Sequence, residues 1–181
     1  MTELLTSTAP GQLAGWLDGE VTTDRDLAPG ELRLLAERIG NEPALWRPHV
    51  RHDAQERYTV LLHRREHLDV WLLCWREVQE TGLHDHDRSA GALHVCEGAL
   101  VEDVLRFNSS STLGSARRKL DAGTSQGFDV GHVHGVRNYG PGPATSIHVY
   151  SPALRGMGHY ELGSGGVRRV QRSYDEGALE P

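Results

Sequence analysis

The sequence predicts a mainly β protein, a small β-barrel that carries a helical cap at its N-terminus. Apolar residues recur with helical spacing only in the first part of the chain, and from Arg57 onward they alternate or form short runs with a period of two. Clusters of Gly, Asn, Ser, Asp and Pro separate these runs, as is typical of antiparallel sandwiches and barrels. A length of 181 residues suits one domain, with the cap over residues 1–50 and the barrel over residues 51–181.

Two helices are expected in the cap. The first is a short amphipathic stretch over residues 11–17. The second covers residues 29–39, where Pro29 suits the first turn and Gly40 suits the end of a helix. Its apolar stripe consists of Leu32, Leu35, Ala36 and Ile39.

Six strands are expected in the barrel, over residues 58–63, 68–75, 92–96, 99–107, 128–136 and 144–150. Glu97-Gly98 is interpreted as a tight hairpin corner, and residues 108–111 and 140–143 as loops. Residues 162–166 predict a turn before a last edge strand over 167–172. The alternating charges of that strand indicate a solvated face.

Composition argues against several functions. The formal net charge of -6 disfavours a nucleic-acid or anionic-membrane surface. The longest apolar runs fall well short of the roughly 20 residues of a membrane helix, and Met1–Leu5 lacks the features of a signal peptide. Cys74 and Cys96 lie in apolar runs, as expected of buried free thiols in a reducing cytoplasm. We therefore predict a cytoplasmic protein, a monomer or a small homo-oligomer.

Histidine is abundant, with eleven residues in the chain. His84 and His86 are two residues apart, so on a strand their side chains leave the same face with about 6.5–7 Å between their backbones. Two such imidazoles can bind one ion of iron or zinc. A third histidine, His132 or His134, lies some fifty residues later and can complete one face of the metal. The opposite positions would then be open to substrate.

The spacing of both stretches resembles a known motif. His84-x-His86 is followed by Gly91 and Gly98, and a second stretch runs through Gly123, Asp129, Gly131, His134 and Asn138. This pattern resembles the two-part motif of the cupin superfamily, a double-stranded β-helix (jelly-roll) barrel that binds its metal inside. The chain departs from the motif twice, with Gly91 where the family usually has Glu and Asp129 where it usually has Pro.

A cupin with three histidines and no Glu resembles the thiol dioxygenases, above all the cysteine dioxygenases. Further matches are Tyr58-Thr59, Leu73-Cys74-Trp75 and the run Ser146-Ile147-His148-Val149-Tyr150-Ser151-Pro152. The resemblance covers roughly residues 45–160. It selects His134 as the third ligand and leaves His132 as a neighbouring pocket residue.

The resemblance implies an Fe(2+) cofactor on His84, His86 and His134, with a small thiol and O₂ as substrates and a sulfinic acid as product. It also implies that Tyr150 directs its hydroxyl at the bound oxygen or sulfur, that His148 hydrogen-bonds this hydroxyl, and that Ser146 orients His148. Some family members link the tyrosine to a cysteine. Gly91 occupies the corresponding position here, so we expect an unlinked tyrosine.

The substrate is less well defined by the sequence. Family members with a Tyr-Thr-Arg run use the arginine to bind the substrate carboxylate, and this chain has Val60 at that position. The substrate contacts predicted here are therefore Tyr58, Val60, Arg64 and His132, with Arg57, Arg65 and Arg137 as other cations. Cysteine, 3-mercaptopropionate, mercaptosuccinate, cysteamine and ergothioneine all stay open as substrates.

Two other functions are compatible with the motifs. Three histidines on Zn²⁺ would make a hydrolase or lyase, because zinc lowers the pKa of a bound water to about 7. A non-catalytic cupin that binds a small ligand is the second alternative. In that protein the row of Ser146, His148 and Tyr150 would have no chemical role.

Overall fold

The structure is a computed structural model that describes residues 10–21, 24–107, 113–163 and 166–173. The start of the chain at Met1–Leu5, the loop expected over residues 108–111 and the centre of the turn expected over 162–166 lie outside these ranges. Along the described chain, helices come first and strands follow. The boundary between cap and barrel at residue 50 stays a prediction.

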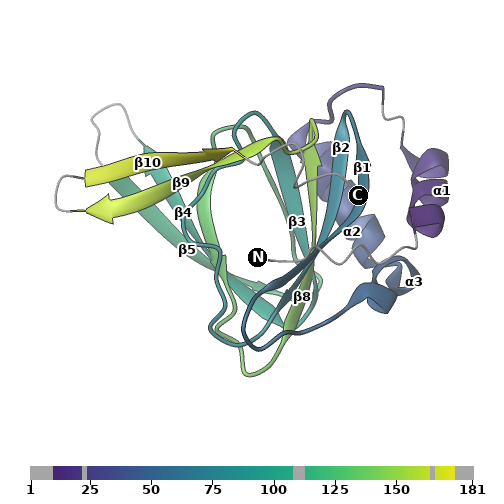
Figure 1. Ribbon diagram of the computed structural model, residues 1–181, viewed down its shortest axis with the longest axis horizontal. Helices are drawn as coiled ribbons and strands as arrows, with labels where there is room; N and C mark the ends of the chain where they lie inside the picture. The colour runs from purple at the N-terminus through teal and green to yellow at the C-terminus, as the bar shows by residue number, and fades with distance from the viewer. Residues whose placement is uncertain (1–9, 22–23, 108–112, 164–165, 174–181) are drawn as a thin grey trace.

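Helices cover one outer face of the molecule, as the sequence predicts (Figure 1). They are α1 (Pro10–Glu20), α2 (Pro29–Gly40), α3 (Pro43–Trp46) and the short 3₁₀ helix η1 (Arg47–His49). The predicted stripe of α2 is buried at every position, Leu32, Leu35, Ala36 and Ile39. In the part of the chain that the structure describes, no helix is long and apolar enough to cross a membrane.

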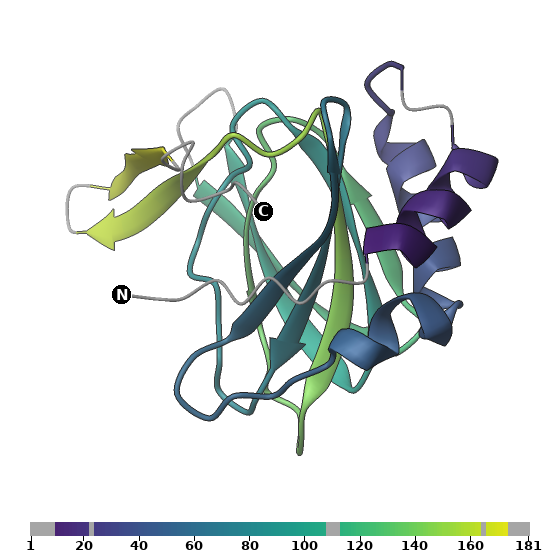
Figure 2. The same cartoon turned by 45° about the vertical axis from the view of Figure 1, so that its right-hand side comes forward.

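The strands form two main sheets and a hairpin. The larger sheet has the order β1-β2-β8-β3-β6, with β1 (Tyr58–Arg65), β2 (Leu68–Trp75), β3 (Ala90–Glu97), β6 (Ser125–Phe128) and β8 (Ala144–Ser151). The smaller sheet has the order β5-β4-β7, with β4 (Ala99–Phe107), β5 (Leu113–Asp121) and β7 (Val133–Arg137). A separate hairpin of β9 (Gly156–Gly163) and β10 (Gly166–Ser173) extends from the side away from the helices (Figure 2).

Both faces of the larger sheet are buried, because α2 covers its outer face and the smaller sheet faces its inner one. Strand β8 is therefore buried at all eight positions. Ile147 and Val149 pack outward into the core beneath the helices. The alternate residues Ser146, His148 and Tyr150 face the barrel interior, and this alternation gives the strand a polar inner row on an otherwise apolar scaffold.

The strand predicted over 128–136 is two strands in two sheets. β6 ends at Phe128 in the larger sheet, and β7 begins at Val133 in the smaller one. A turn at residues 129–132 carries the chain across, and Gly131 has a φ of 82° there, which favours glycine. The apolar run alone does not reveal this crossing, because both halves contribute to the same barrel interior.

The predicted hairpin at Glu97-Gly98 is also wrong. β3 and β4 pair with different strands, so the bend at Gly98 joins the two sheets. Its φ of 74° and the close approach of the Pro143 carbonyl, 2.5 Å from where a Cβ would lie, require glycine there. Strands β5 and β9, and all of β6 before Phe128, were not predicted from the sequence.

Strand β10 confirms the edge strand expected over 167–172, and one of its charged residues also contacts a buried carboxylate. Arg168 pairs with Glu161 at the surface. The next residue, Arg169, donates two hydrogen bonds to the buried carboxylate of Asp85. Arg169 is 38 % exposed, so it too reaches solvent, but its contact with the segment that carries His84 and His86 was not predicted.

Candidate metal centre

Main-chain pairing brings the three motif histidines together. His84 and His86 lie on the segment between β2 and β3, and His134 lies on β7. His84 N–H donates to His134 O at 2.8 Å, and His134 N–H donates to His84 O at 2.9 Å. Directly opposed residues of an antiparallel pair present their side chains on one face, so these two rings lie side by side.

The three imidazoles converge in the barrel interior. Their ring centroids are 4.7 Å apart for His84 and His134, 4.9 Å for His84 and His86, and 5.1 Å for His86 and His134. One ring nitrogen of each lies within 4.8 Å of the others. All three are at most 3 % exposed. This trio is the geometry expected of three neutral ligands on one metal ion.

The hydrogen bonds of these rings test whether a metal fits. Nδ1–H of His84 donates to Gly82 O at 3.0 Å, and Nδ1 of His134 lies 2.7 Å from Glu102 Oε1. Each ring therefore keeps its Nε2 lone pair. Nε2 of His86 is buried and has no hydrogen-bond partner among the described residues. A buried nitrogen without a partner is unfavourable unless a ligand satisfies it, so the residues fit a bound ion.

Burial also keeps the rings uncharged. Desolvation lowers the pKa of His84 and His86 well below the usual value, and the proximity of His134 lowers both further because two protonated rings would repel each other. Desolvation likewise lowers the pKa of His134, against the opposing effect of Glu102. Because metal ligation requires neutral imidazole, these shifts prepare the site for a cation near neutral pH.

Glu102 is the centre of a buried hydrogen-bond network behind His134. Its side chain is fully buried and receives hydrogen bonds from His134, from His132 at 3.2 Å and from Arg118 Nε at 2.5 Å. Burial raises the pKa of this carboxyl, but the three donors together hold it well below its usual value. Glu102 thus fixes the ring orientation of His134, as carboxylates do in many histidine–metal sites.

His132 differs from its predicted position in the substrate pocket. It lies in the turn before β7, stacks on Phe128 with 5.1 Å between ring centroids, and bonds Glu102. Its ring lies 4.9 Å from that of His134, and both rings contact Oε1 of Glu102, which lies on the Nδ1 side of His134. Together with Arg118, His132 borders a different groove, which Val104, Ala116 and the turn at residues 129–131 also line.

Polar side chains on β8 form a row that faces the barrel interior opposite the three histidines. Ser146 Oγ lies 2.9 Å from His148 Nε2, and Tyr150 Oη lies 3.4 Å from His148 Nδ1. The structure thus brings the three residues together in the order that the resemblance implies. Trp75 Nε1–H donates to Ser146 Oγ at 2.9 Å and extends the row by one buried group. Tyr150 also approaches the metal trio, with 4.9 Å between its ring and that of His86.

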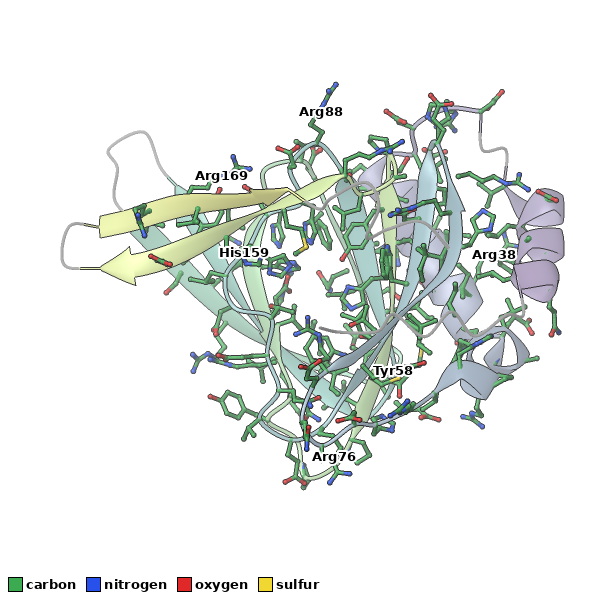
Figure 3. All side chains as sticks on the ribbon, viewed as in Figure 1. Arg38, Tyr58, Arg76, Arg88, His159 and Arg169 are labelled. Atoms are coloured by element: carbon green, nitrogen blue, oxygen red, sulfur yellow. The ribbon has the colours of Figure 1, made fainter. Side chains whose placement is uncertain are left out.

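The cavity between these two groups has a volume of about 140 Å³, which suits a small ligand. His84, His134, His148 and Tyr150 form its polar wall. Its remaining lining consists of Arg57, Thr59, Trp71, Leu73, Thr81, Val136, Leu154, Met157 and His159. Figure 3 shows His159 on β9, directed toward the rings inside the barrel.

None of the predicted substrate contacts lines this cavity. Val60 is buried beneath the helices and Tyr58 packs against the same cluster. Strand alternation is the reason: Tyr58 and Val60 share the outer face of β1, whereas Arg57 and Thr59 share the inner face. The inner-face cation is therefore Arg57, whose Nη1–H donates to Glu80 O at 2.6 Å and whose guanidinium covers Trp75.

Arg64 was expected on the same face as Val60. A bulge between Leu61 and His63 shifts the register, so Arg64 pairs with Asp69 on the opposite face. The guanidinium donates to both oxygens of the buried Asp69, at 2.8 Å and 2.5 Å. This two-point contact explains why Arg64 does not reach the cavity.

Gly91 pairs directly with Tyr150 across β3 and β8. A Cβ at this position would lie 2.5 Å from Phe128 Cε2 and 2.9 Å from Tyr150 Cδ1. The site is packed against the backbone of residue 91 and has no room for the carboxylate that the cupin motif usually places there. Nor is there a sulfur at this position to react with Tyr150.

Sequence reasoning missed Glu102 as a site residue, and it named Arg57 only among alternative cations and Trp75 only as part of the family match. A signal for Glu102 does exist in the sequence, since it alternates in phase with Leu100 and Val104, and a lone carboxylate on an apolar strand face requires a partner. The identity of that partner follows only from the pairing of β4 with β7.

A barrel of two antiparallel sheets with three interior histidines defines the chain as a cupin-type protein with a group of residues that could hold a metal ion. The model of the family "Cysteine dioxygenase type I" matches residues 12–162. The chain therefore belongs to the cysteine dioxygenase type I family, a family of metal-dependent dioxygenases.

Individual relatives share only about a quarter of their aligned residues with this chain. Human cysteine dioxygenase type 1 is 25 % identical over 151 residues, covering 80 % of this chain and 75 % of the human one. The mouse protein of the same name is 26 % identical over the same coverage. Among solved structures, TT1209 of Thermus thermophilus has a TM-score of 0.51 at 23 % identity and covers 59 % of this chain and 92 % of its own. A double-stranded β-helix protein of Klebsiella pneumoniae has a TM-score of 0.50 at 22 % identity, covering 61 % and 84 %. These two similarities support the fold.

Proposed function

We propose that the protein is an Fe(II)-dependent thiol dioxygenase that converts a small thiol and O₂ to the sulfinic acid, R–SH + O₂ → R–SO₂H. The observation that carries the proposal is the pairing of two groups across one small cavity: three buried neutral imidazoles and the row from Ser146 to Tyr150. Membership of the cysteine dioxygenase family supports the same reaction.

His84, His86 and His134 would hold the ion. Bound ferrous iron would supply the redox chemistry that joins both oxygen atoms to the substrate sulfur. Because all three ligands are neutral, the site keeps a full positive charge toward the cavity, and this charge favours an ionised thiol. The absence of a carboxylate at Gly91 preserves that attraction.

The row of Ser146, His148 and Tyr150 on β8 would hold the phenol proton of Tyr150 and direct it toward the ligand. Trp75 donates to Ser146 Oγ, so the Ser146 hydroxyl hydrogen can be directed at His148 Nε2. In that arrangement Nδ1–H of His148 faces Tyr150 Oη, and the phenol hydrogen is directed at the ligand. Burial lowers the pKa of His148 to about 3, so this ring stays neutral and the row keeps its direction at neutral pH.

The substrate we favour also carries a carboxylate, bound by Arg57. This side chain lines the cavity on the inner face of β1 and lies over Trp75, with 5.0 Å from its Cζ to the ring centroid. A guanidinium can bind a carboxylate by two parallel hydrogen bonds. Cysteine, 3-mercaptopropionate and mercaptosuccinate satisfy this requirement, whereas cysteamine does not.

Anaerobic reconstitution with Fe(II), followed by an oxygen-electrode screen of these thiols and mass spectrometry of the products, tests the reaction. We expect O₂ consumption and a mass increase of two oxygen atoms. Arg57→Gln should raise KM for the carboxylate thiols and leave KM for cysteamine unchanged. Arg51→Gln, which alters an exposed arginine paired with Asp53, is the control.

Failure of every thiol to consume O₂ would contradict the proposal. Turnover of an ester or other substrate by zinc-loaded protein without O₂ would support the hydrolase or lyase. Ligand binding that is unaffected by Tyr150→Phe, without any turnover, would support a non-catalytic cupin. Cytoplasmic location remains a prediction, consistent with the free thiols of Cys74 and Cys96.

A further inference from the structure

Strand β10 lies beyond residue 162, where the match to the family model ends, and yet it contacts the metal centre from outside. The contact is made by Arg169. Its guanidinium donates from Nε to Asp85 Oδ2 at 2.9 Å and from Nη2 to Asp85 Oδ1 at 3.1 Å. Asp85 is the residue between the two predicted ligands His84 and His86.

The strand arrangement explains why this contact reaches the site. The segment around His84 pairs with β7 on one side and with β9 on the other, through His134 and His159. Its neighbour β9 in turn pairs with β10, where Tyr160 lies opposite Arg169. His134, His84 and His159 therefore share the inner face, and Asp85, Tyr160 and Arg169 share the outer face. Figure 3 labels His159 and Arg169 on this hairpin.

The Asp85 side chain is only 7 % exposed, and its carboxylate is surrounded by donors. In addition to Arg169, it accepts hydrogen bonds from Tyr160 Oη at 2.7 Å and from the amides of Gly158 and Asp87, both at 3.0 Å. The Asp85 amide itself donates to Gly158 O at 2.8 Å. One side chain thus joins β9, β10 and the histidine segment, and we name Asp85, Tyr160 and Arg169 the outer latch.

We propose that Arg169 is a positioning residue of the metal centre: through Asp85 it fixes the backbone that sets the spacing and direction of His84 and His86. This inference rests on the proposed function, since it concerns the same ligands. The two-point contact matters because a planar guanidinium constrains both the position and the rotation of the carboxylate, whereas an ammonium group acts as a point charge.

The latch also holds the cavity wall. Met157 and His159 line the cavity from β9, on the face opposite the latch. Loosening the hairpin would displace these two side chains together with the histidine segment. A lost latch should therefore alter both metal affinity and KM for the thiol.

A matched pair of variants tests the proposal. Arg169→Gln removes the contact, and Arg168→Gln changes the adjacent arginine of the same strand, which pairs only at the surface with Glu161 among the described residues. Anaerobic calorimetric titration with Fe(II) should give a dissociation constant about tenfold higher for Arg169→Gln, the order expected when a group that supports a metal ligand is lost. Arg168→Gln should match the wild type, and Arg169→Lys should lie between.

Amide hydrogen exchange over residues 83–87 gives a readout that requires no metal, and it should be faster in Arg169→Gln. A purely structural role would lower the melting temperature of the metal-free protein without changing Fe(II) affinity. Equal affinity and exchange in Arg169→Gln and Arg168→Gln would overturn the inference. If Arg169→Gln does not fold, Tyr160→Phe, which removes one donor to Asp85, replaces it with the same expected direction and the same contrary result.

These outcomes are distinct from failure of the proposed function. Wild-type protein that binds Fe(II) but oxidises no thiol would contradict the dioxygenase and leave the latch to be decided by the affinity comparison. If the wild type oxidises a thiol and Arg169→Gln has the same Fe(II) affinity as Arg168→Gln, only the inference on Arg169 is contradicted.

Discussion

Oε1 of Glu102 lies 2.7 Å from Nδ1 of His134, with neither side chain more than 1 % exposed. This contact connects the third histidine of the metal centre to a carboxylate on β4, the strand paired with β7. A carboxylate at Nδ1 fixes the tautomer of the imidazole and increases the basicity of the nitrogen that faces the ion. Glu102 therefore belongs to the site, although it does not line the cavity.

Replacing this carboxylate should weaken metal binding. Glu102→Gln keeps the shape of the side chain but removes its charge, and we expect about 10–100-fold lower Fe(II) affinity in anaerobic titration. Asp103→Asn is the matched control, because Asp103 is the next residue on β4 and pairs outward with Arg117 and Arg137. An unchanged dissociation constant in Glu102→Gln would contradict the role given to this residue.

Removal of the phenol oxygen should affect turnover rather than binding. Tyr150→Phe retains the ring that packs near His86 and loses the hydroxyl that faces His148. We expect kcat for thiol oxidation to fall by about 10²-fold, as for loss of a proton-transferring group, with little change in Fe(II) affinity. Tyr139→Phe, at an exposed tyrosine, should leave both constants unchanged. Equal kcat in Tyr150→Phe and wild type would contradict a chemical role.

Two glycine substitutions should change stability in opposite directions. Gly91→Ala places a methyl group against Phe128 and Tyr150, so we expect the free energy of unfolding to fall by about 1–3 kcal/mol. Gly15→Ala in α1 meets nothing within 4 Å and should raise it by roughly 0.5–1 kcal/mol, the helix-propensity difference. Urea unfolding measures both. A neutral Gly91→Ala variant would show that the packing around Tyr150 yields easily.

The tyrosine should also be unmodified in the purified protein. Gly91 is the residue directly across from Tyr150, and it carries no side chain with which a cross-link can form. The intact mass should therefore equal that of the linear sequence, and the tryptic peptide containing Tyr150 should be recovered without a partner peptide. A covalently linked peptide pair would contradict this expectation.

Acid should destabilise the metal-free protein through its buried histidines. The pKa of His148 falls to about 3 on folding, chiefly through desolvation, whereas in the unfolded chain it is about 6.5. The unfolded state therefore binds more protons below about pH 6.5, and stability is complete above that value and decreases as the pH falls toward 3. One such group accounts for about 1.4 kcal/mol between about pH 7.5 and about pH 5.5.

Urea unfolding at these two pH values, with wild type and His148→Gln, isolates this contribution. The variant should lose about 1.4 kcal/mol less than the wild type on acidification, because glutamine does not titrate. His67 should contribute the opposite pH dependence of stability, because its hydrogen bond to Asp26 raises its pKa. An equal loss in His148→Gln and wild type would contradict the assignment of a buried neutral ring.

Local patterns in the sequence were sufficient for much of the fold. The stripe of α2, the bounds of β2 and β4, and the alternation of β8 follow from periodicity, which depends only on residues near one another in the chain. The pair His84 and His86 is visible for the same reason. Resemblance to the family supplied His134, and the structure places all three rings together.

Other features depended on how strands pair. Bulges and turns change which face a residue occupies, and the bulge after Leu61 moved Arg64 away from the position that regular alternation gives. Regular alternation before the bulge directs Arg57 rather than Val60 into the cavity, and the turn before β7 places His132 outside it.

The three metal-binding residues can be read from the sequence, because the spacing of His84 and His86 is a local pattern and the family resemblance points to His134. The groups that support those ligands become visible only in the folded chain. Glu102 is distant in sequence from His134, and Arg169 is distant from Asp85, and both pairs meet through sheet register. Register is set by hydrogen bonds between distant segments, and no local pattern encodes it.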